Sequence, residues 1–202
     1  MAGLRERKKE QTRQRIAATA LRLFGERGFD AVTVNEIAEA AEVAKATLFA
    51  YFPTKESLVL DGVGEEDLAG IVADRPRDKT PLDALRAHYR AATEERLTAL
   101  DREALIARIG VIFDTPALGG AANSLLYRQR QSLARVLAEE HGETAAALMA
   151  AQIAASLLTL QESFFHRLAD GASPQDVAPL LAADVELAFD LLENGLNQAK
   201  GK

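Results

Sequence analysis

Proline follows serine or threonine at three places in this chain: Thr80-Pro81, Thr115-Pro116 and Ser173-Pro174. Proline suits the first turn of a helix because its missing N–H costs no hydrogen bond there, and the preceding hydroxyl can cap free backbone amides. Thr33-Val-Asn-Glu36 has the spacing of a capping box and indicates a fourth helix start. Because Pro (6) and Gly (13) are sparse among 202 residues, the sequence predicts an all-α chain.

Apolar periodicity between these signals predicts about nine helices. They are expected at residues 9–25, 33–41 and 44–52, from 54, from 81, at 101–113, from 116, and at 143–168 and 174–198. The uncharged run Thr144–Gln161 is interrupted by polar residues and is interpreted as a buried helix rather than a membrane span. The N-terminus is charged and no apolar signal region follows it, so a cytoplasmic protein is expected.

The net charge of -6 is unevenly distributed along the chain. Residues 1–60 carry 10 Lys/Arg and 8 Asp/Glu, whereas residues 61–202 carry 14 and 22. A basic end on an acidic body is the pattern of a nucleic-acid contact surface joined to a separate domain, although a solvated charged tail gives the same pattern. The chain has no Cys, and its three His do not stand at metal-ligand spacing, so no metal site is expected.

The segments 33–41 and 44–52 are two short helices separated by a break of two or three residues, which is a helix-turn-helix pattern. Helices joined this tightly must cross steeply, so the second one projects and can enter a major groove. Apolar residues, Leu48 among them, are expected to lock the pair together, while Phe24, Phe29 and Phe52 are expected in the core. For Phe49, a position at the edge of the core and a position on the reading face remain equally open.

The stretch from about Lys9 to Leu60 resembles the DNA-binding domain of the TetR family of transcriptional regulators. The resemblance rests on several landmarks in order: Phe-Gly-x-x-Gly-Phe, Thr-Val-x-x-Ile-Ala, Lys-x-Thr-Leu-Phe-x-Tyr-Phe and Lys-Glu-x-Leu. It implies a basic arm and DNA-binding domain in residues 1–60, with the helix-turn-helix at 33–52. It also implies an effector-binding and dimerisation domain in residues 61–202, and the seam is expected within a helix that the two domains share.

The resemblance assigns DNA-contacting roles to individual side chains. Thr33, Thr47, Tyr51 and Lys55 are expected to contact phosphates, Thr33 through both its hydroxyl and its backbone N–H. Lys45, Ala46, Phe49 and Ala50 are expected to meet base edges, with Lys45 able to bond guanine. The basic residues between Arg5 and Arg15 are expected to follow phosphates or to enter the minor groove.

Two positions depart from the family pattern. Glu42 stands where the family usually has Gly, so the turn must accommodate a side chain, under strain if φ is positive. Ala44 stands where Ser or Thr is usual, which removes a helix cap. Since Ala50 is also small, direct base readout is expected to be thin. Glu42 is expected to sit in the turn with its carboxylate directed away from DNA.

The larger domain is expected to bind an unidentified small-molecule effector and no other cofactor. The candidate lining residues are His88, Tyr89, Phe113, Tyr127, Gln161, Phe164, Phe165 and His166. The last two helices are expected to pair with their twins in a homodimer, where small residues such as Ala146, Ala147, Ala150, Ala154 and Ala155 allow close approach. Two copies are needed to read a palindromic operator on double-stranded DNA.

These features favour a DNA-binding regulator, expected to be a repressor that its effector releases from the operator. An activator, or a degenerate regulator acting through a protein partner, is the alternative, and the latter is supported by Glu42, Ala44 and Ala50. An enzyme is disfavoured: no phosphate-binding loop, hydrolase elbow or dinucleotide fingerprint occurs, no catalytic residue is expected, and the paired carboxylates Glu65 and Glu66 are interpreted as solvated.

Overall fold

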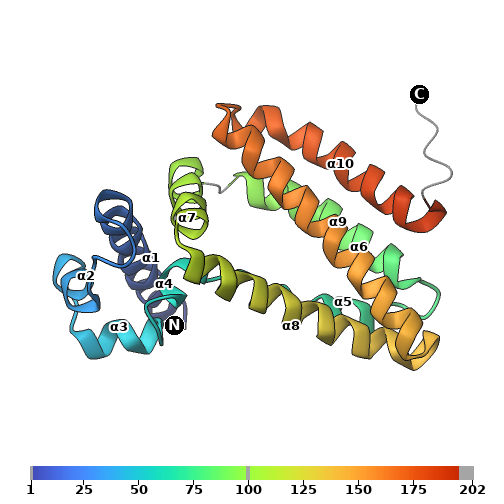
Figure 1. Ribbon diagram of the computed structural model, residues 1–202, viewed down its shortest axis with the longest axis horizontal. Coiled ribbons are helices and arrows are strands. Elements are labelled where there is room, and N and C mark those ends of the chain that lie inside the picture. The colour runs from blue at the N-terminus through green and yellow to red at the C-terminus, as the bar shows by residue number, and fades with distance from the viewer. Residues whose placement is uncertain (1, 99–100, 196–202) are drawn as a thin grey trace. The chain divides into compact units, whose positions relative to one another are not determined.

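A computed structural model describes residues 2–98 and 101–195, and every regular element in these ranges is a helix (Figure 1). The helices are α1 (Ala2–Arg27), α2 (Val34–Ala40), α3 (Lys45–Tyr51), α4 (Ser57–Leu60), α5 (Leu68–Ala73), α6 (Pro81–Thr98), α7 (Arg102–Asp114), α8 (Pro116–His141), α9 (Glu143–Ala169) and α10 (Pro174–Asn194). The all-α prediction is confirmed. The addition to the predicted set is α5, which is separated from α4 by Gly62 and Gly64, both at positive φ.

The described chain forms two compact units. The first contains the residues up to Val63 together with Glu103–Asn123, and the second contains Gly64–Arg102 and the residues from Ser124 onward. This division differs from the predicted 1–60 and 61–202, because α7 and the start of α8 belong to the first unit. One reason is that Arg108 of α7 donates to the carbonyl of Asp61 at 3.1 Å. One boundary between the two units lies within α8, so both units share this helix. An earlier boundary along the chain lies in the turn after α4.

The core of the first unit is built by short apolar stripes from successive helices. Helix α1 packs against α2 and α4, and α2 packs against α3. Fully buried side chains include Ile16 and Phe24 of α1, Ile37 of α2 and Leu48 of α3. Each of these lies on the predicted apolar side, so the helix-turn-helix is held by the residues that its sequence pattern indicates.

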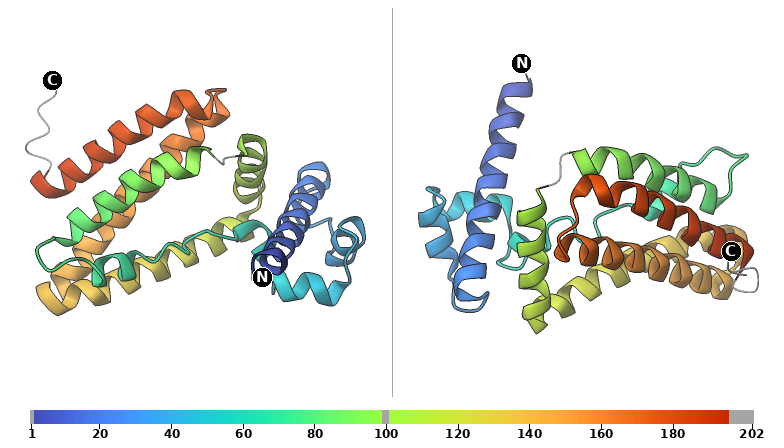
Figure 2. Two further views of the ribbon diagram at one scale, coloured as in Figure 1. Left: turned by 180° about the vertical axis from the view of Figure 1, so that it is seen from behind. Right: turned by 90° about the horizontal axis from the view of Figure 1, so that it is seen from above.

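The second unit places α10 against α6 and α9, and these helices lie side by side in Figures 1 and 2. Buried residues of α9 recur every three or four positions, which gives this helix one core-facing stripe. Ala146 and Ala150 belong to that stripe, so they face their own protomer's core, whereas Ala147 and Ala155 are exposed. Helix α9 alone among the described helices has the length and mean hydropathy, 1.4, of a membrane span.

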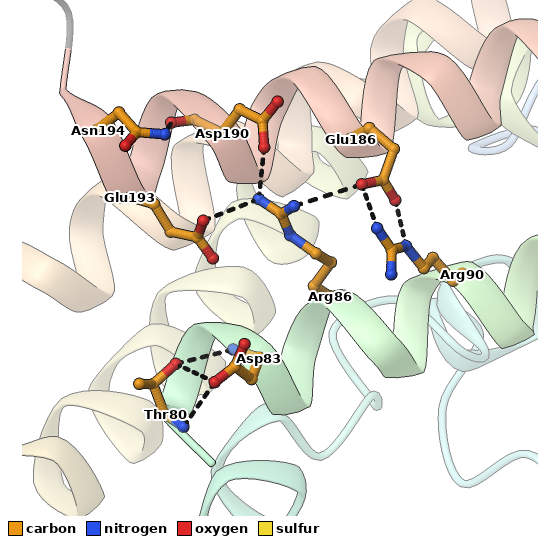
Figure 3. A network of polar contacts seen from close by, with 8 residues as sticks. All are labelled: Thr80, Asp83, Arg86, Arg90, Glu186, Asp190, Glu193 and Asn194. Atoms are coloured by element: carbon orange, nitrogen blue, oxygen red, sulfur yellow. Dashed lines mark hydrogen bonds and ion pairs between the residues drawn. The ribbon is translucent and has the colours of Figure 1, made fainter.

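A charged network fastens α6 to α10 (Figure 3). The guanidinium of Arg86, with its side chain only 16% exposed, lies 2.8 Å from Asp190, 3.2 Å from Glu193 and 3.3 Å from Glu186. Arg90 forms two hydrogen bonds to Glu186 and thereby holds the pKa of that carboxylate below its ordinary value. The acidic residues of α10 in this network therefore form ion pairs with arginines of α6 in the same unit.

Candidate nucleic-acid interface

A complete capping box begins α2, and both hydrogen-bond donors of Thr33 are engaged within it. The Thr33 N–H and hydroxyl both donate to the Glu36 carboxylate, at 2.8 and 2.7 Å, and the Glu36 N–H donates back to the hydroxyl at 3.3 Å. Together with Arg27, whose guanidinium lies 2.7 Å away, these bonds lower the pKa of Glu36 to about 2, the Thr33 N–H contributing most. The expected phosphate contact through the Thr33 donors would therefore have to displace Glu36.

The turn between α2 and α3 is made by Glu42 in the left-handed region, at φ 52. The N–H groups of Glu42 and Val43 donate to the carbonyls of Glu39 and Ala38, at 3.0 and 2.9 Å, and close the turn. Among the non-Gly residues that the structure describes, Glu42 is alone in having positive φ. The strain expected at this position is therefore present. Its side chain is exposed, and α3 begins after Ala44 without a side-chain cap.

Helix α3 buries one narrow stripe and exposes the rest. Leu48 is 0% exposed and fixes the helix on the first unit, while Tyr51 in the last turn is half-buried. The exposed residues are Lys45, Ala46, Thr47, Phe49 and Ala50. Phe49 is 39% exposed and its ring lies 6.0 Å below the Lys45 ammonium, so it belongs to the outward face. Apart from Tyr51 in the last turn, the residues expected on the reading face of α3 are all exposed.

Lys55 is held by aromatic rings, a feature that sequence reasoning did not anticipate. Its ammonium lies 4.4 Å from the Phe29 ring centre and 5.7 Å from that of Phe24. Such cation–π contacts restrict a flexible lysine without neutralising it. Thr54 and Ser57 fix the backbone on either side through reciprocal hydrogen bonds of 3.1 and 3.2 Å. Phe24 and Phe29, expected to serve only as core, therefore also position the Lys55 charge.

Asp61 joins three helices of the first unit. Its carboxylate accepts both an Nε and an Nη hydrogen bond from Arg13 of α1, and its carbonyl accepts from Arg108 of α7. The Arg13 guanidinium also lies 5.3 Å from the Phe52 ring centre. Burial lowers the pKa of Arg108, against the opposing effect of the Asp61 charge. These contacts engage Arg13 inside the unit, so it is less available for DNA than its place in the basic segment indicated.

The second unit contains a polar cluster around Glu66, a residue that the sequence predicts to be solvated. Its side chain is only 16% exposed; its carboxylate lies 2.7 Å from His88 Nε2 and accepts a hydrogen bond from the Tyr89 hydroxyl. The Glu66 carbonyl accepts from the Gln129 side chain at 2.7 Å. The solvated interpretation is therefore wrong for Glu66. His88 and Tyr89 were candidate pocket residues, whereas Glu66 and Gln129 had no recognisable sequence signal.

The remaining candidate pocket residues are dispersed. Phe113 lies in the first unit and is 74% exposed. In the second unit, Tyr127, Gln161 and His166 are exposed, and Phe164 and Phe165 are half-buried with ring centres 5.7 Å apart. Tyr127 lies beneath the Arg130 guanidinium at 4.7 Å. The structure thus brings His88 and Tyr89 together around Glu66, and Phe164 beside Phe165. Among the described residues no three His, Asp or Glu side chains are grouped as a metal ion would require.

Known protein families match both the N-terminal and the C-terminal part of this chain. Residues 16–61 match the family model of bacterial regulatory proteins of the tetR family, and residues 79–197 match that of the MftR C-terminal domain. The transcriptional regulator TcmR of Streptomyces glaucescens is 32% identical over 146 residues, which is 69% of this chain and 65% of TcmR. The putative mycofactocin biosynthesis regulator MftR of Mycobacterium tuberculosis is 26% identical over 95% of this chain and 94% of MftR.

A solved structure shares the fold. The structure of NalD, the secondary repressor of the MexAB-OprM multidrug efflux pump in Pseudomonas aeruginosa, superposes with a TM-score of 0.56 at 19% identity and covers 89% of this chain and 96% of NalD. One family model covers the helix-turn-helix, and the other covers more than half of the chain. The chain belongs to the TetR family of bacterial transcriptional regulators, with a C-terminal domain of the MftR type.

Proposed function

We propose that this regulator is a homodimeric repressor that binds a palindromic operator and leaves it when a small molecule binds the second unit. The observation that carries this proposal is the geometry of α3, where Leu48 is fully buried and the flanking residues are exposed. TetR-family proteins are DNA-binding regulators rather than enzymes, and we infer that this face reads DNA. A cytoplasmic location follows as part of the proposal, since the operator DNA lies there.

Most of the binding free energy is proposed to come from phosphate contacts. Of the residues expected to meet bases, Lys45 alone has a long polar side chain, while Ala46, Ala50 and Phe49 offer only apolar contact. Apolar groups can meet a thymine methyl but cannot form the paired hydrogen bonds that discriminate bases strongly. Sequence preference should therefore depend largely on DNA shape, and affinity should fall steeply with salt.

The dimer is proposed to form through α9 and α10. Both helices expose large apolar side chains: Leu148 and Leu158 on α9, and Leu180 and Leu187 on α10. Leu180 and Leu187 are seven residues apart and so lie on one face of α10. Burying a leucine is worth about 1.5–3 kcal/mol, which gives this face a reason to pair with its twin. Pairing would present two copies of α3 to half-sites about one helical turn apart.

The effector is proposed to bind in the second unit near Glu66, His88 and Tyr89. This cluster supports the proposal because it is a half-buried polar group within a helical unit, which is where bundles place specificity-determining contacts. No other cofactor is proposed. If effector binding weakens DNA binding by a typical coupling free energy of about 1–3 kcal/mol, DNA must weaken effector binding equally.

The test is a titration in which the protein is added to labelled DNA from upstream of its own gene. Fluorescence anisotropy measures the binding affinity at several salt concentrations. The expected slope of log affinity against log salt is about -0.9 for each phosphate neutralised. Lys45→Ala and Thr47→Ala should weaken binding, and Lys79→Ala, an exposed change in the second unit, should not. Absence of a salt-sensitive complex would refute the proposal and favour a protein partner. An upstream reporter that becomes less active on deletion of the gene would indicate an activator.

A further inference from the structure

Two adjacent glycines, Gly119 and Gly120, stand near the start of α8. Glycine is, after proline, the residue that least favours the interior of a helix. The sequence has no other place where two glycines are adjacent. Both nevertheless lie within the helix, which runs from Pro116 to His141. The pair therefore weakens α8 locally, and its presence needs an explanation other than helix formation.

Neither space nor backbone conformation explains the pair. Outside the backbone of its own helix, a Cβ on Gly120 would have no atom within 4 Å, and a Cβ on Gly119 would meet only the Ile112 carbonyl oxygen, at 3.9 Å. Neither glycine has a positive φ. Gly64 provides the contrast, because its φ is 67 and a Cβ there would lie 3.0 Å from a backbone carbon of Leu125. Packing requires Gly64, whereas alanine would fit at both positions of the pair.

The pair lies close to the point where α8 passes from one unit to the other, between residues 123 and 124. Leu118 in the first unit and Leu133 in the second are both 0% exposed. Helix α8 is described along its whole length, and no side chain between these two leucines is buried. The stretch that crosses the boundary therefore lacks the buried packing that supplies most of the stability of a helix in a protein.

On the side of the second unit, α8 is held by the segment that follows α4. Gly64 approaches the backbone of Leu125, and the Gln129 side chain donates to the Glu66 carbonyl at 2.7 Å. On the side of the first unit, Leu118 is the buried anchor. Residues 119–124 thus form a span between two held points, and the glycine pair stands at one end of it.

We propose that residues 119–124 of α8 form a flexible joint, which lets one dimer fit its two α3 helices to half-sites at more than one spacing. Sharp bends in helices have local causes, and pairs of very small residues are among them. One added base pair moves a half-site by about 3.4 Å and turns it by about 35°. The consequence for DNA rests on the proposed function of operator binding, whereas the bending of α8 does not.

The bending is tested by double electron–electron resonance on the full-length chain. The chain has no Cys, so spin labels can be attached at Ala117→Cys and Arg135→Cys alone, both exposed positions of α8. These positions are 18 residues apart, which places them on one face of the helix and about 27 Å apart if it is straight. Dilution into unlabelled protein confines the measurement to pairs within one protomer.

The wild-type distances should form a broad distribution that extends below 27 Å, because a bend brings the two labels together. In Gly119→Ala/Gly120→Ala the distribution should become narrow and lie near 27 Å, since alanine is the residue that most favours a helix. Gly110→Ala in α7 is the matched control, because a Cβ there also has no atom within 4 Å. It should leave the distribution broad. A narrow wild-type distribution, or one that the double variant does not change, would overturn the joint.

The consequence for DNA is tested with the operator and a copy that has one base pair inserted between its half-sites. Fluorescence anisotropy should show that the insertion costs Gly119→Ala/Gly120→Ala about tenfold more affinity than it costs the wild type, the equivalent of one lost base contact. Gly110→Ala should behave as the wild type. Equal losses in the wild type and the double variant would overturn the adaptation to spacing. Absence of any complex with the wild type would instead refute operator binding, and the distance measurement would still decide whether α8 bends.

Discussion

Replacing Glu42 by glycine should stabilise the helix-turn-helix. Glu42 holds a φ of 52, and a left-handed conformation costs a residue with a Cβ about 1–2 kcal/mol. Glycine avoids this cost but loses about 0.5–1 kcal/mol more conformational freedom on folding. The difference predicts a net stabilisation of about 0.5–1 kcal/mol for Glu42→Gly. Since the side chain is exposed, no packing is lost.

Native-state hydrogen exchange of the full chain measures this effect locally. The Val43 amide, which donates to Ala38, reports opening of the turn and should exchange about 2–5 times more slowly in Glu42→Gly. Glu42→Ala is the matched control because it removes the carboxylate and keeps the Cβ, so its exchange should resemble that of the wild type. Equal exchange rates in the glycine and alanine variants would refute the strain argument and assign any change to charge.

Three further changes test separate features. Phe29→Leu removes the ring beneath the Lys55 ammonium, so operator affinity should fall about 2–5-fold. The slope of log affinity against log salt should not change, because the Lys55 charge remains although the ring no longer positions it. A changed slope would contradict this explanation. The lowered pKa of Glu36, about 2 against 4.5, means that its stabilising contribution is complete above pH 4.5 and is lost as the pH falls through 2. The urea midpoint of the wild type should therefore exceed that of Glu36→Gln at pH 6, with the difference vanishing near pH 2. Leu187→Arg, at a side chain 58% exposed, should give monomers in sedimentation while Gln175→Arg does not; a dimeric Leu187→Arg protein would place the interface elsewhere.

The elements of the first unit could be predicted because their signals are local. The capping box at Thr33 and Glu36 begins α2 as expected, and the apolar spacing that buries Leu48 follows from helical periodicity. The consequence of replacing the usual glycine by Glu42 was also predictable, since a turn this short offers few backbone conformations. Local rules also predicted that Lys45, Ala46, Thr47 and Ala50 face outward on α3, but they left the position of Phe49 open.

Contacts between residues distant in sequence were not predictable. Nothing in the sequence indicates that Phe29 lies beneath Lys55, or that Glu66 approaches Gln129, because both depend on how helices pack. The role expected for Thr33 shows a different limit. The hydroxyl and the N–H of Thr33 are available to DNA only if no group of the chain accepts hydrogen bonds from them. The Glu36 carboxylate accepts hydrogen bonds from both.

The acidic total of the chain is a poor guide to its partner for the same reason. Net charge counts every ionised group, but recognition depends on the charges left unpaired at the contact surface. In the second unit the carboxylates of Glu186 and Asp190 are engaged by arginines of α6, and in the first unit Asp61 is engaged by Arg13. Lys8 and Lys9 of α1, which line a groove together with Tyr51 of α3, are exposed. A chain of charge -6 can therefore present a cationic surface to DNA, because part of its acidic excess is used in holding its own helices together.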